Sequence, residues 1–294
     1  MTSALTPRVQ DWRAGGELVE IGPHRIFVRR RRDGGGPVLL FLHGFPSSSY
    51  DWRATLTLLA ERPMLAPDFL GFGLSDKPPD ATYSLFGQAD IVEQLLASDG
   101  RPVVVVAHDM GTSVATELLA RDLKQSLSFK VAGVLLFNGS MIVERASLTW
   151  AQKALRSPLG LAFARLSNRP VFVRQFARLF SPAHPLSEEE AEDQWVLWRR
   201  AGGARRAHRL IHYIDERQTH APRWHGAIRD WPGELRFAWG MLDPVATPAV
   251  LAGLRELRLS APVTELAELG HYPQIEQPGA IAALVEELLA ASAG

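Results

Sequence analysis

The sequence predicts an α/β protein with a mostly parallel β-sheet, helices on both faces and one inserted block of helices. Short apolar runs alternate with segments of helical periodicity over residues 1–139. Only helical patterns follow in residues 140–230, and the alternation resumes in residues 231–294. Buried strands that alternate with helices form parallel sheets covered on both faces. We therefore expect a core made of the first and last segments and a helical cap made of the middle one.

The first core segment opens with a predicted hairpin, ELVEIG and RIFVRR around Gly22-Pro23. Its remaining strands are predicted at PVLLFL, MLAPD, VVVVA and VAGVLLF, with helices at SLFGQADIVEQLLAS and from about Thr112 to Leu123. The last core segment contributes the strands LRFAWG and VTELAE, the helix PAVLAGLREL and a final helix from about Pro278. The order of these elements predicts that most of the strands run parallel.

The middle segment contains helical patterns rich in Arg, Trp and His. One of them, LSEEEAEDQWVLWRR, begins with Ser187 and Glu190 at the spacing of a capping box. Another is ARRAHRLIHYIDERQ. We expect this segment to lie above the carboxyl edge of the sheet, because open α/β sheets bind their ligands at that edge.

Composition excludes several classes of function. Lys+Arg and Asp+Glu both number 32, so the net charge is zero and no overall field favours nucleic acid or a membrane. The run Arg29–Arg32 is next to DGGGP, which indicates a solvated strand end rather than a nucleic-acid patch. Cysteine is absent, which excludes disulfides and thiolate metal sites. No apolar run approaches the ~20 residues of a membrane helix and no leader pattern is found, so a cytoplasmic location is expected.

Four loops that each follow a predicted strand carry the residues of interest: HGFP, HDMG, MLDP and GHYP. They supply Asp109, Asp243 and His271, in the chain order nucleophile, acid, histidine. Each residue alone has a structural interpretation, since an Asp at a helix start is commonly a cap and Asp-Pro a turn. Because the carboxyl ends of parallel strands meet at one edge, the three together predict a catalytic group.

A tight turn between a strand and a helix presents Asp109, and the helix directs N–H groups and the positive end of its dipole at the carboxylate. The backbone N–H groups of Met110 and Phe45 are the expected oxyanion donors. His271 can take a proton from water if Asp243 holds its other ring nitrogen.

The motifs FLHGFPSSSYDW, DFLGFGLSDKP, HDMG, FNGSM, GMLDPV and GHYPQIE resemble those of the epoxide hydrolase and haloalkane dehalogenase branch of the α/β-hydrolase superfamily. Within the branch, the chain most resembles proteins of the mesoderm-specific transcript type, and the likeness includes the cap segment HYIDERQTHAPRW. The resemblance implies an eight-stranded α/β-hydrolase fold and no metal or cofactor. It also implies that Asp109 attacks an sp³ carbon to form an alkyl-enzyme ester, which water activated by His271 then hydrolyses.

Departures from the family pattern bear on the substrate. Haloalkane dehalogenases carry a halide-binding Trp and fluoroacetate dehalogenases an Arg where this chain has Met110. Epoxide hydrolases use cap tyrosines to protonate the ring oxygen, and Tyr213 is the only tyrosine of the cap. Tyr213, assisted by His212 or His208, is thus a candidate acid, although its pattern also suits a packing residue. An epoxide hydrolase-like enzyme is favoured; the alternatives are a haloalkane dehalogenase-like hydrolase and a non-catalytic ligand-binding protein on the same fold.

Further candidates for substrate contact are His108, Trp52, Asn138 and His212. Each also has a structural interpretation: His108 can support the turn at Asp109, Asn138 can cap a turn, and a Trp is commonly a packing residue. The expected partners are a small apolar substrate and water, acting on a monomer or homodimer.

Overall fold

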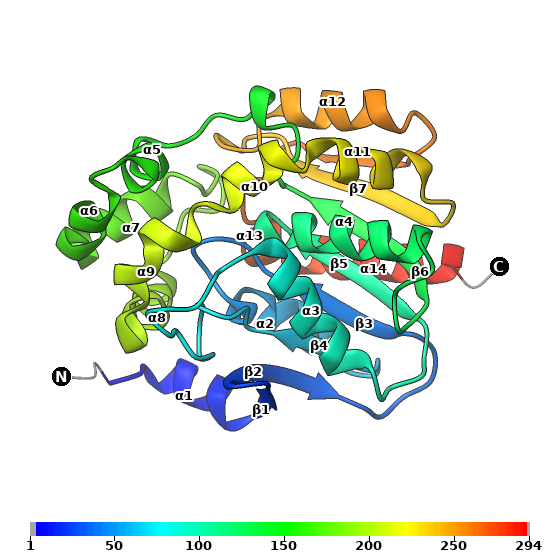
Figure 1. Cartoon of the computed structure of the whole chain (residues 1–294), viewed down its shortest axis with the longest axis horizontal. Helices are drawn as coiled ribbons and strands as arrows, with labels where there is room; N and C mark the ends of the chain where they lie inside the picture. Colours follow the sequence, from blue (N-terminus) through cyan, green and yellow to red (C-terminus); the bar gives the residue numbers. More distant parts are fainter. Residues whose placement is uncertain (1–3, 293–294) are drawn as a thin grey trace.

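Eight strands form one sheet in the computed structural model, which describes residues 4–292. Their order across the sheet is β1-β2-β4-β3-β5-β6-β7-β8 (Figure 1). Strand β2 pairs antiparallel with β1 and β4, and every other neighbouring pair is parallel. The predicted eight-stranded, mostly parallel sheet is thus confirmed. The strands are β1 (Glu17–Ile21), β2 (His24–Arg31), β3 (Val38–Leu42), β4 (Met64–Pro67), β5 (Val103–His108), β6 (Val131–Phe137), β7 (Glu234–Gly240) and β8 (Val263–Leu266).

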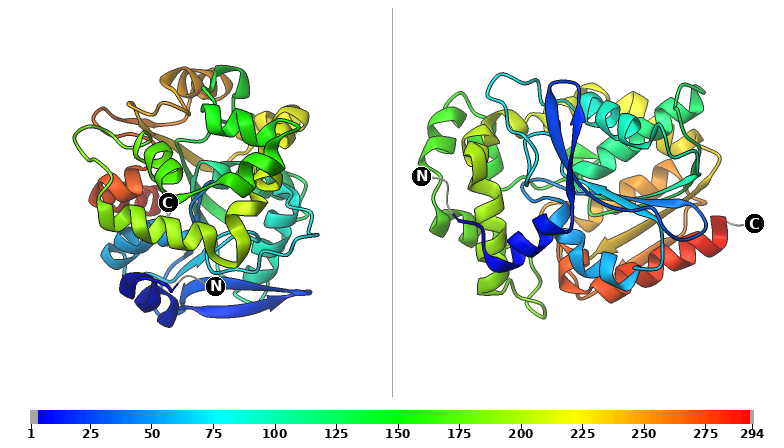
Figure 2. Two further views of the ribbon diagram at one scale, coloured as in Figure 1. Left: turned by 90° about the vertical axis from the view of Figure 1, so that its left-hand side faces the viewer. Right: turned by 90° about the horizontal axis from the view of Figure 1, so that it is seen from below.

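Helices cover both faces of the sheet (Figure 2). Helices α3 and α4 pack on one face, and α2 and α14 pack on the other, each with its own buried apolar cluster. Helix α1, which the sequence patterns did not predict, begins after the N-cap Thr6. In the described part of the chain, no helix is both long enough and apolar enough to span a membrane. The core helices are α1 (Pro7–Ala14), α2 (Arg53–Leu58), α3 (Leu85–Leu96), α4 (Met110–Leu123), α12 (Pro248–Leu257), α13 (Pro273–Glu276) and α14 (Pro278–Ser292), with a 3₁₀ helix η1 (Ser49–Trp52).

The central strands follow from their composition. Every residue of β3 and β5 is buried, as a parallel strand covered on both faces requires. Four consecutive valines open β5, and β-branched side chains favour the extended backbone. Helix α3 begins at Ser84, whose hydroxyl accepts a hydrogen bond from the Gly87 N–H. These local preferences place the ends of β3 and β5 side by side at the carboxyl edge.

Among the described residues, the chain between β6 and β7 contains helices and loops but no strand. Its helices in residues 150–210 lie beyond the carboxyl edge of the sheet, whereas the helix of residues 221–230 packs along α4 (Figure 1). We refer to residues 140–230 as the helical segment. Ser187 caps α8, as its sequence context predicts, but the Glu190 carboxylate binds Arg53 and Gln194. The helices are α5 (Trp150–Arg156), α6 (Gly160–Leu166), α7 (Arg169–Ala177), α8 (Glu188–Arg199), α9 (Gly203–Leu210), α10 (Tyr213–Thr219) and α11 (Ala221–Asp230), with 3₁₀ helices η2 (Val143–Arg145) and η3 (Arg200–Gly202).

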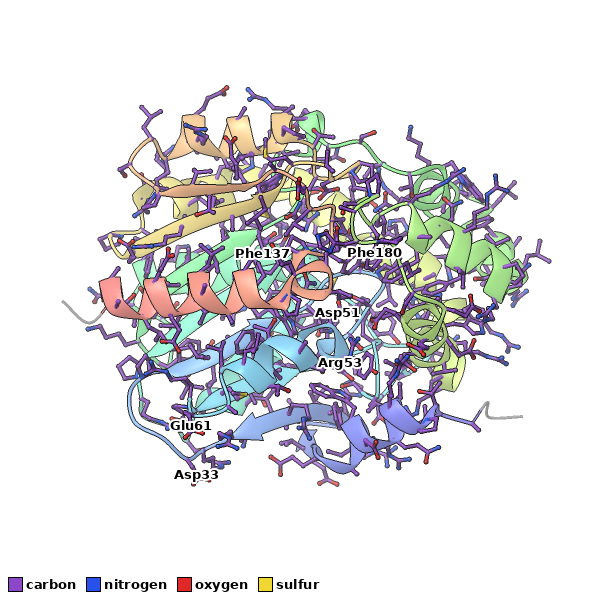
Figure 3. All side chains as sticks on the ribbon, turned by 180° about the vertical axis from the view of Figure 1, so that it is seen from behind. Asp33, Asp51, Arg53, Glu61, Phe137 and Phe180 are labelled. Carbon is purple, nitrogen blue, oxygen red and sulfur yellow. The ribbon has the colours of Figure 1, made fainter. Side chains whose placement is uncertain are left out.

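Helix α8 joins the helical segment to the core through buried polar contacts. Asp193 accepts hydrogen bonds from Tyr50 Oη at 2.6 Å and from Thr6 Oγ1 at 2.6 Å. Asp51 accepts one from Gln194 Nε2 at 2.7 Å, and Figure 3 shows Asp51 beside the helical segment, on the side of the sheet. Since buried carboxylates are costly without partners, these contacts fix how the helical segment sits on the sheet.

Candidate active site

Asp109 occupies a strained turn between β5 and α4. Its φ is 43° and its ψ −112°, a conformation that costs an L-residue about 1–3 kcal/mol. Glycines allow the close approach of the surrounding chain: a Cβ on Gly111 would lie 2.5 Å from the carbonyl oxygen of Leu42. A Cβ on Gly44 would lie 2.6 Å from the Asp109 Cβ. The turn therefore holds the carboxylate at the edge of the sheet against the loop that follows β3.

One oxygen of the Asp109 carboxylate has a backbone donor. The N–H of Phe45, one of the two predicted oxyanion donors, donates a hydrogen bond to Oδ2 at 2.9 Å. Met110, the other predicted donor, is the first residue of α4. The Phe45 loop is itself fixed by His43, whose Nε2 accepts from the Phe69 N–H at 2.9 Å and whose Nδ1 contacts the Gly44 carbonyl oxygen. Oδ1 of Asp109 is left facing the helical segment.

His271 and Asp243 form a buried hydrogen-bonded pair. The His271 Nδ1–H donates to Asp243 Oδ2 at 2.6 Å, which leaves Nε2 free to accept a proton. Asp243 Oδ1 accepts the N–H groups of Val245 at 2.7 Å and Ala246 at 3.0 Å. Burial alone would lower the pKa of His271, but the charge and hydrogen bond of Asp243, with the nearby charge of Asp109, raise this pKa above its ordinary value. The pair is therefore an orientated base at the same sheet edge as Asp109.

Two of the residues predicted to contact substrate instead support this pair. Asn138 donates from Nδ2 to Asp243 Oδ2 at 2.8 Å. His108 donates from Nε2 to the His271 carbonyl oxygen at 2.6 Å, and its Nδ1 accepts from Gln274 Nε2 at 3.1 Å. Burial lowers the pKa of His108 well below its ordinary value, so the ring stays neutral. Both side chains are fully buried and hold other groups in place.

The other two predicted contact residues lie away from the site. Trp52 is fully buried and packs between Phe41 and Phe137 in the cluster on the α2 and α14 face. His212 is 54% exposed and its Nδ1 binds the Asp215 carboxylate on the outside of α10. Their sequence patterns therefore reflect a core aromatic and a surface ion pair.

Arg217 is a residue of the site that sequence reasoning missed. It is 1% exposed and extends from α10 to the turn at Asp109. Its Nη2 donates to the Asp109 carbonyl oxygen at 2.6 Å and lies 3.6 Å from Asp109 Oδ1, and its Nε donates to Ser113 Oγ at 2.6 Å. The sequence offered one signal for Arg217, its spacing from the candidate Tyr213: the two residues are four apart and so share one face of α10.

Tyr213 lies between Phe45 and Arg217. Its ring centroid is 5.9 Å from that of Phe45, and the Arg217 guanidinium carbon is 4.7 Å from the ring. Burial and the Asp109 charge raise the pKa of Tyr213, and Arg217 and Gln152 lower it by a smaller amount, so its hydroxyl keeps its proton. Tyr213 thus places a buried, protonated hydroxyl near the turn at Asp109.

A mainly apolar cavity of about 100 Å³ lies between the sheet edge and the helical segment. His271, Phe45 and Val245 contribute its wall on the sheet side. The helical segment contributes chiefly apolar side chains, among them Leu155, Phe163, Phe172, Phe176 and Trp198, together with the amide of Gln152. Such a cavity suits a small apolar molecule with one or two polar atoms.

One family model and two known relatives match most of this chain. Residues 39–284 match the model of the alpha/beta hydrolase family. The "Putative hydrolase LipZ" of Mycobacterium tuberculosis is 55% identical over 285 residues, covering 97% of this chain and 99% of that protein. The human mesoderm-specific transcript homolog protein is 36% identical over 288 residues, covering 93% and 85%. This confirms the resemblance inferred from the motifs.

Among solved structures, the haloalkane dehalogenase DbeA from Bradyrhizobium elkani superposes with a TM-score of 0.78. Its sequence is 24% identical, and the match covers 95% of this chain and 98% of that one. At that identity the likeness concerns the fold. With the family model spanning most of the chain and relatives similar over nearly their whole length, this protein belongs to the alpha/beta hydrolase family.

Proposed function

We propose that this protein is a hydrolase that uses Asp109 as a nucleophile, forms an alkyl-enzyme ester and acts on epoxides. The observation that carries the proposal is the position of the carboxylate. Asp109 Oδ2 is bound by the Phe45 N–H at 2.9 Å, and the His271–Asp243 pair lies at the same edge of the sheet. A carboxylate needs no base to attack carbon, whereas the ester it forms needs an activated water and an oxyanion site.

In the first step, Asp109 Oδ1 attacks a ring carbon of the epoxide. The new bond joins Oδ1 to that carbon, the carbon–oxygen bond of the ring breaks, and the ring oxygen leaves as an alkoxide. Tyr213 donates its hydroxyl proton to this oxygen, so that the product of the step is a neutral hydroxyalkyl ester. Gln152 lowers the pKa of Tyr213, which stabilises the tyrosinate formed in this step.

In the second step, water attacks Cγ of the ester while His271 Nε2 takes its proton. The resulting oxyanion develops on Oδ2, where the Phe45 N–H already donates. The bond between Cγ and the bridging Oδ1 then breaks, the alkoxide formed on Oδ1 receives a proton from His271, and a diol leaves. Asp109 now carries the oxygen of the water as a carboxylic acid, and its remaining proton passes to the Tyr213 oxyanion, so that the carboxylate and the tyrosine are both restored. Asp243 keeps His271 orientated and stabilises its positive charge during the step.

Epoxides are favoured over haloalkanes because of the groups around Asp109. Tyr213 offers a proton to an opening ring, whereas the side chain of Met110 has no N–H with which to bind a leaving halide. The cavity is mainly apolar and adjoins both Phe45 and His271. The proposed role of the helical segment is that of a cap that encloses the substrate.

The test is intact-mass analysis of the His271→Gln variant after incubation with an epoxide and with a chloroalkane of the same carbon skeleton. We expect a mass increase equal to the whole epoxide, located on Asp109 by peptide mapping, because the ester forms but water is not activated. Tyr213→Phe should suppress the epoxide adduct by about 10²-fold or more. An adduct with the chloroalkane alone would indicate dehalogenation, and no adduct across a broad panel of both would contradict the mechanism.

Turnover should depend on pH through His271. The base must be neutral to accept a proton, so activity is expected above its raised pKa and is lost as the pH falls through it. Asp243, Asp109 and Glu276 raise this pKa, whereas His108 stays neutral and adds no charge. In Asp243→Asn, the acidic limb of the pH–rate profile should move to lower pH, and turnover should fall by about 10³-fold or more. Rates measured from roughly pH 5 to 9 test this, and an unmoved limb would assign it to another group.

A further inference from the structure

One face of the helical segment has an unusual distribution of charge. The chain has 32 acidic residues overall, yet none occurs between Glu144 and Glu188. The same stretch contains seven basic residues: Arg145, which pairs with Glu256, and the six residues Lys153, Arg156, Arg165, Arg169, Arg174 and Arg178 on or next to its helices. Helices α5, α6 and α7 make up most of this stretch. In a chain with zero net charge, these three helices therefore carry a local excess of positive charge.

Large apolar side chains are exposed on the same three helices. Five of the ten exposed large hydrophobic residues of the described chain are found here: Trp150 at 48%, Leu159 at 74%, Leu161 at 42%, Leu166 at 77% and Val171 at 36%. Scattered exposed apolar residues are ordinary, but a group of this kind indicates an interaction site. The Trp150 and Phe163 rings meet edge to face at 5.4 Å, which joins α5 to α6.

Four of the basic residues lack an ionic partner among the described residues. Arg156 pairs with Asp215, and Arg169 pairs with Glu188 and Glu192. No ion pair involves the remaining four, which are all exposed: Lys153, Arg165, Arg174 and Arg178. Helices α5, α6 and α7 lie together at the end of the molecule opposite the C-terminus (Figure 1). We refer to the exposed side chains of these helices as the α5–α7 face.

We propose that the α5–α7 face binds the surface of a lipid bilayer that contains anionic headgroups. Interfacial helices insert apolar side chains, often including Trp and Leu, between lipids and place Lys and Arg among the headgroups. The α5–α7 face offers both kinds of side chain. A second copy of this chain fits less well, because a symmetric contact would bring two sets of four unpaired cations together.

The inner sides of the same helices line the cavity at the candidate active site. Leu155 of α5, Phe163 of α6 and Phe172 of α7 face it. When the α5–α7 face is bound to a bilayer, these helices, and with them the cavity wall, lie at the lipid surface, where apolar compounds accumulate. The proposal concerns binding alone and does not depend on the reaction proposed for Asp109.

Co-sedimentation of the whole protein with vesicles tests the proposal. The vesicles contain either phosphatidylcholine alone or phosphatidylcholine with roughly 30% phosphatidylglycerol. We expect binding to the anionic vesicles, weaker binding to the neutral ones, and loss of binding at high salt. The charge variant K153Q/R165Q/R174Q/R178Q and the apolar variant L159S/L166S should each lower the partition coefficient for anionic vesicles by about tenfold or more.

Matched controls come from the rest of the surface. Leu259 and Leu58 are 89% and 58% exposed away from this face, so L259S/L58S removes comparable apolar area. The variant R31Q/R32Q/K124Q/K130Q removes four exposed charges elsewhere. Both controls should bind anionic vesicles like the wild type. The proposal would be overturned if the wild type did not bind anionic vesicles, or if the variants of the α5–α7 face and the control variants lost vesicle binding equally. So would sedimentation velocity showing a dimer that L159S/L166S dissociates, because the face would then be an interface between copies.

Discussion

Replacing Asp109 with glycine is expected to abolish turnover and to give a more stable protein than replacing it with alanine. Both variants lack the proposed nucleophile, so turnover should fall by about 10⁴-fold or more. Only alanine keeps the strain of a Cβ at φ 43° and ψ −112°. Glycine also has more conformational entropy in the unfolded chain, which offsets part of this strain. The free energy of unfolding of the glycine variant should therefore exceed that of the alanine variant by about 1 kcal/mol.

Chemical denaturation of the two variants measures this difference. Because both remove the same carboxylate, the loss of its contacts with Phe45 and Arg217 cancels in the comparison. Gln125 provides the matched control, since it has a φ of 54° in an exposed turn outside the site. Gln125→Gly should likewise exceed Gln125→Ala in stability, with turnover unchanged. If the alanine variant at Asp109 retains activity, another group is the nucleophile.

Replacing Arg217 with methionine is expected to make the alkyl-enzyme accumulate. Arg217 Nη2 is 3.6 Å from Asp109 Oδ1, the oxygen that becomes the bridging atom of the proposed ester. During hydrolysis this oxygen develops negative charge as the alcohol leaves, and a nearby cation stabilises it. During alkylation the same oxygen loses its charge, and the cation gives no such help. We therefore expect the charge of Arg217 to favour the second step of the proposed reaction.

Rapid-quench intact-mass analysis separates the two steps. In Arg217→Met, hydrolysis should slow by about tenfold or more relative to alkylation, so the esterified fraction at steady state rises. Arg217→Lys should restore part of the hydrolysis rate because it keeps the charge. Arg156→Met is the control, as it removes an ion pair with Asp215 of the same helix without touching Asp109. Equal slowing of both steps would show that Arg217 serves only to hold the turn.

The same variant should also be less stable than the wild type. Arg217 is 1% exposed and satisfies the Asp109 carbonyl oxygen and Ser113 Oγ. Its removal leaves the Asp109 charge with the Phe45 N–H but without its cation, at a cost of about 3–5 kcal/mol for a buried ion pair broken from one side. Lysine should recover part of this loss, which keeps the kinetic comparison possible with a folded protein.

The sheet and the turn at Asp109 could be predicted from sequence because they depend on local signals. Runs such as Val103–Val106 specify buried strands, and Gly111 allows the chain to turn sharply after His108. Parallel strands place their carboxyl ends at one edge, so the loops of Asp109, Asp243 and His271 had to meet there. Their order along the chain was sufficient for that inference.

Residues predicted to contact substrate could not be placed in the same way. Asn138 follows β6 at the right edge, yet its amide binds Asp243, 105 residues away. Trp52 follows the Phe45 loop but points to the opposite face of the sheet. A single residue after a strand can turn toward either face, and sequence periodicity does not specify which.

The sequence by itself determined the α/β order of elements, the strand–turn–helix at Asp109 and the meeting of three loops, because each depends on contacts between neighbours in the chain or on the geometry common to parallel strands. Only the tertiary structure decided which part of the helical segment reaches the site. Arg217 contacts Asp109 across 108 residues because α11 packs on α4 and brings the neighbouring α10 within reach of the turn at Asp109. That packing is the sum of many weak long-range contacts, and no local pattern in the chain encodes it.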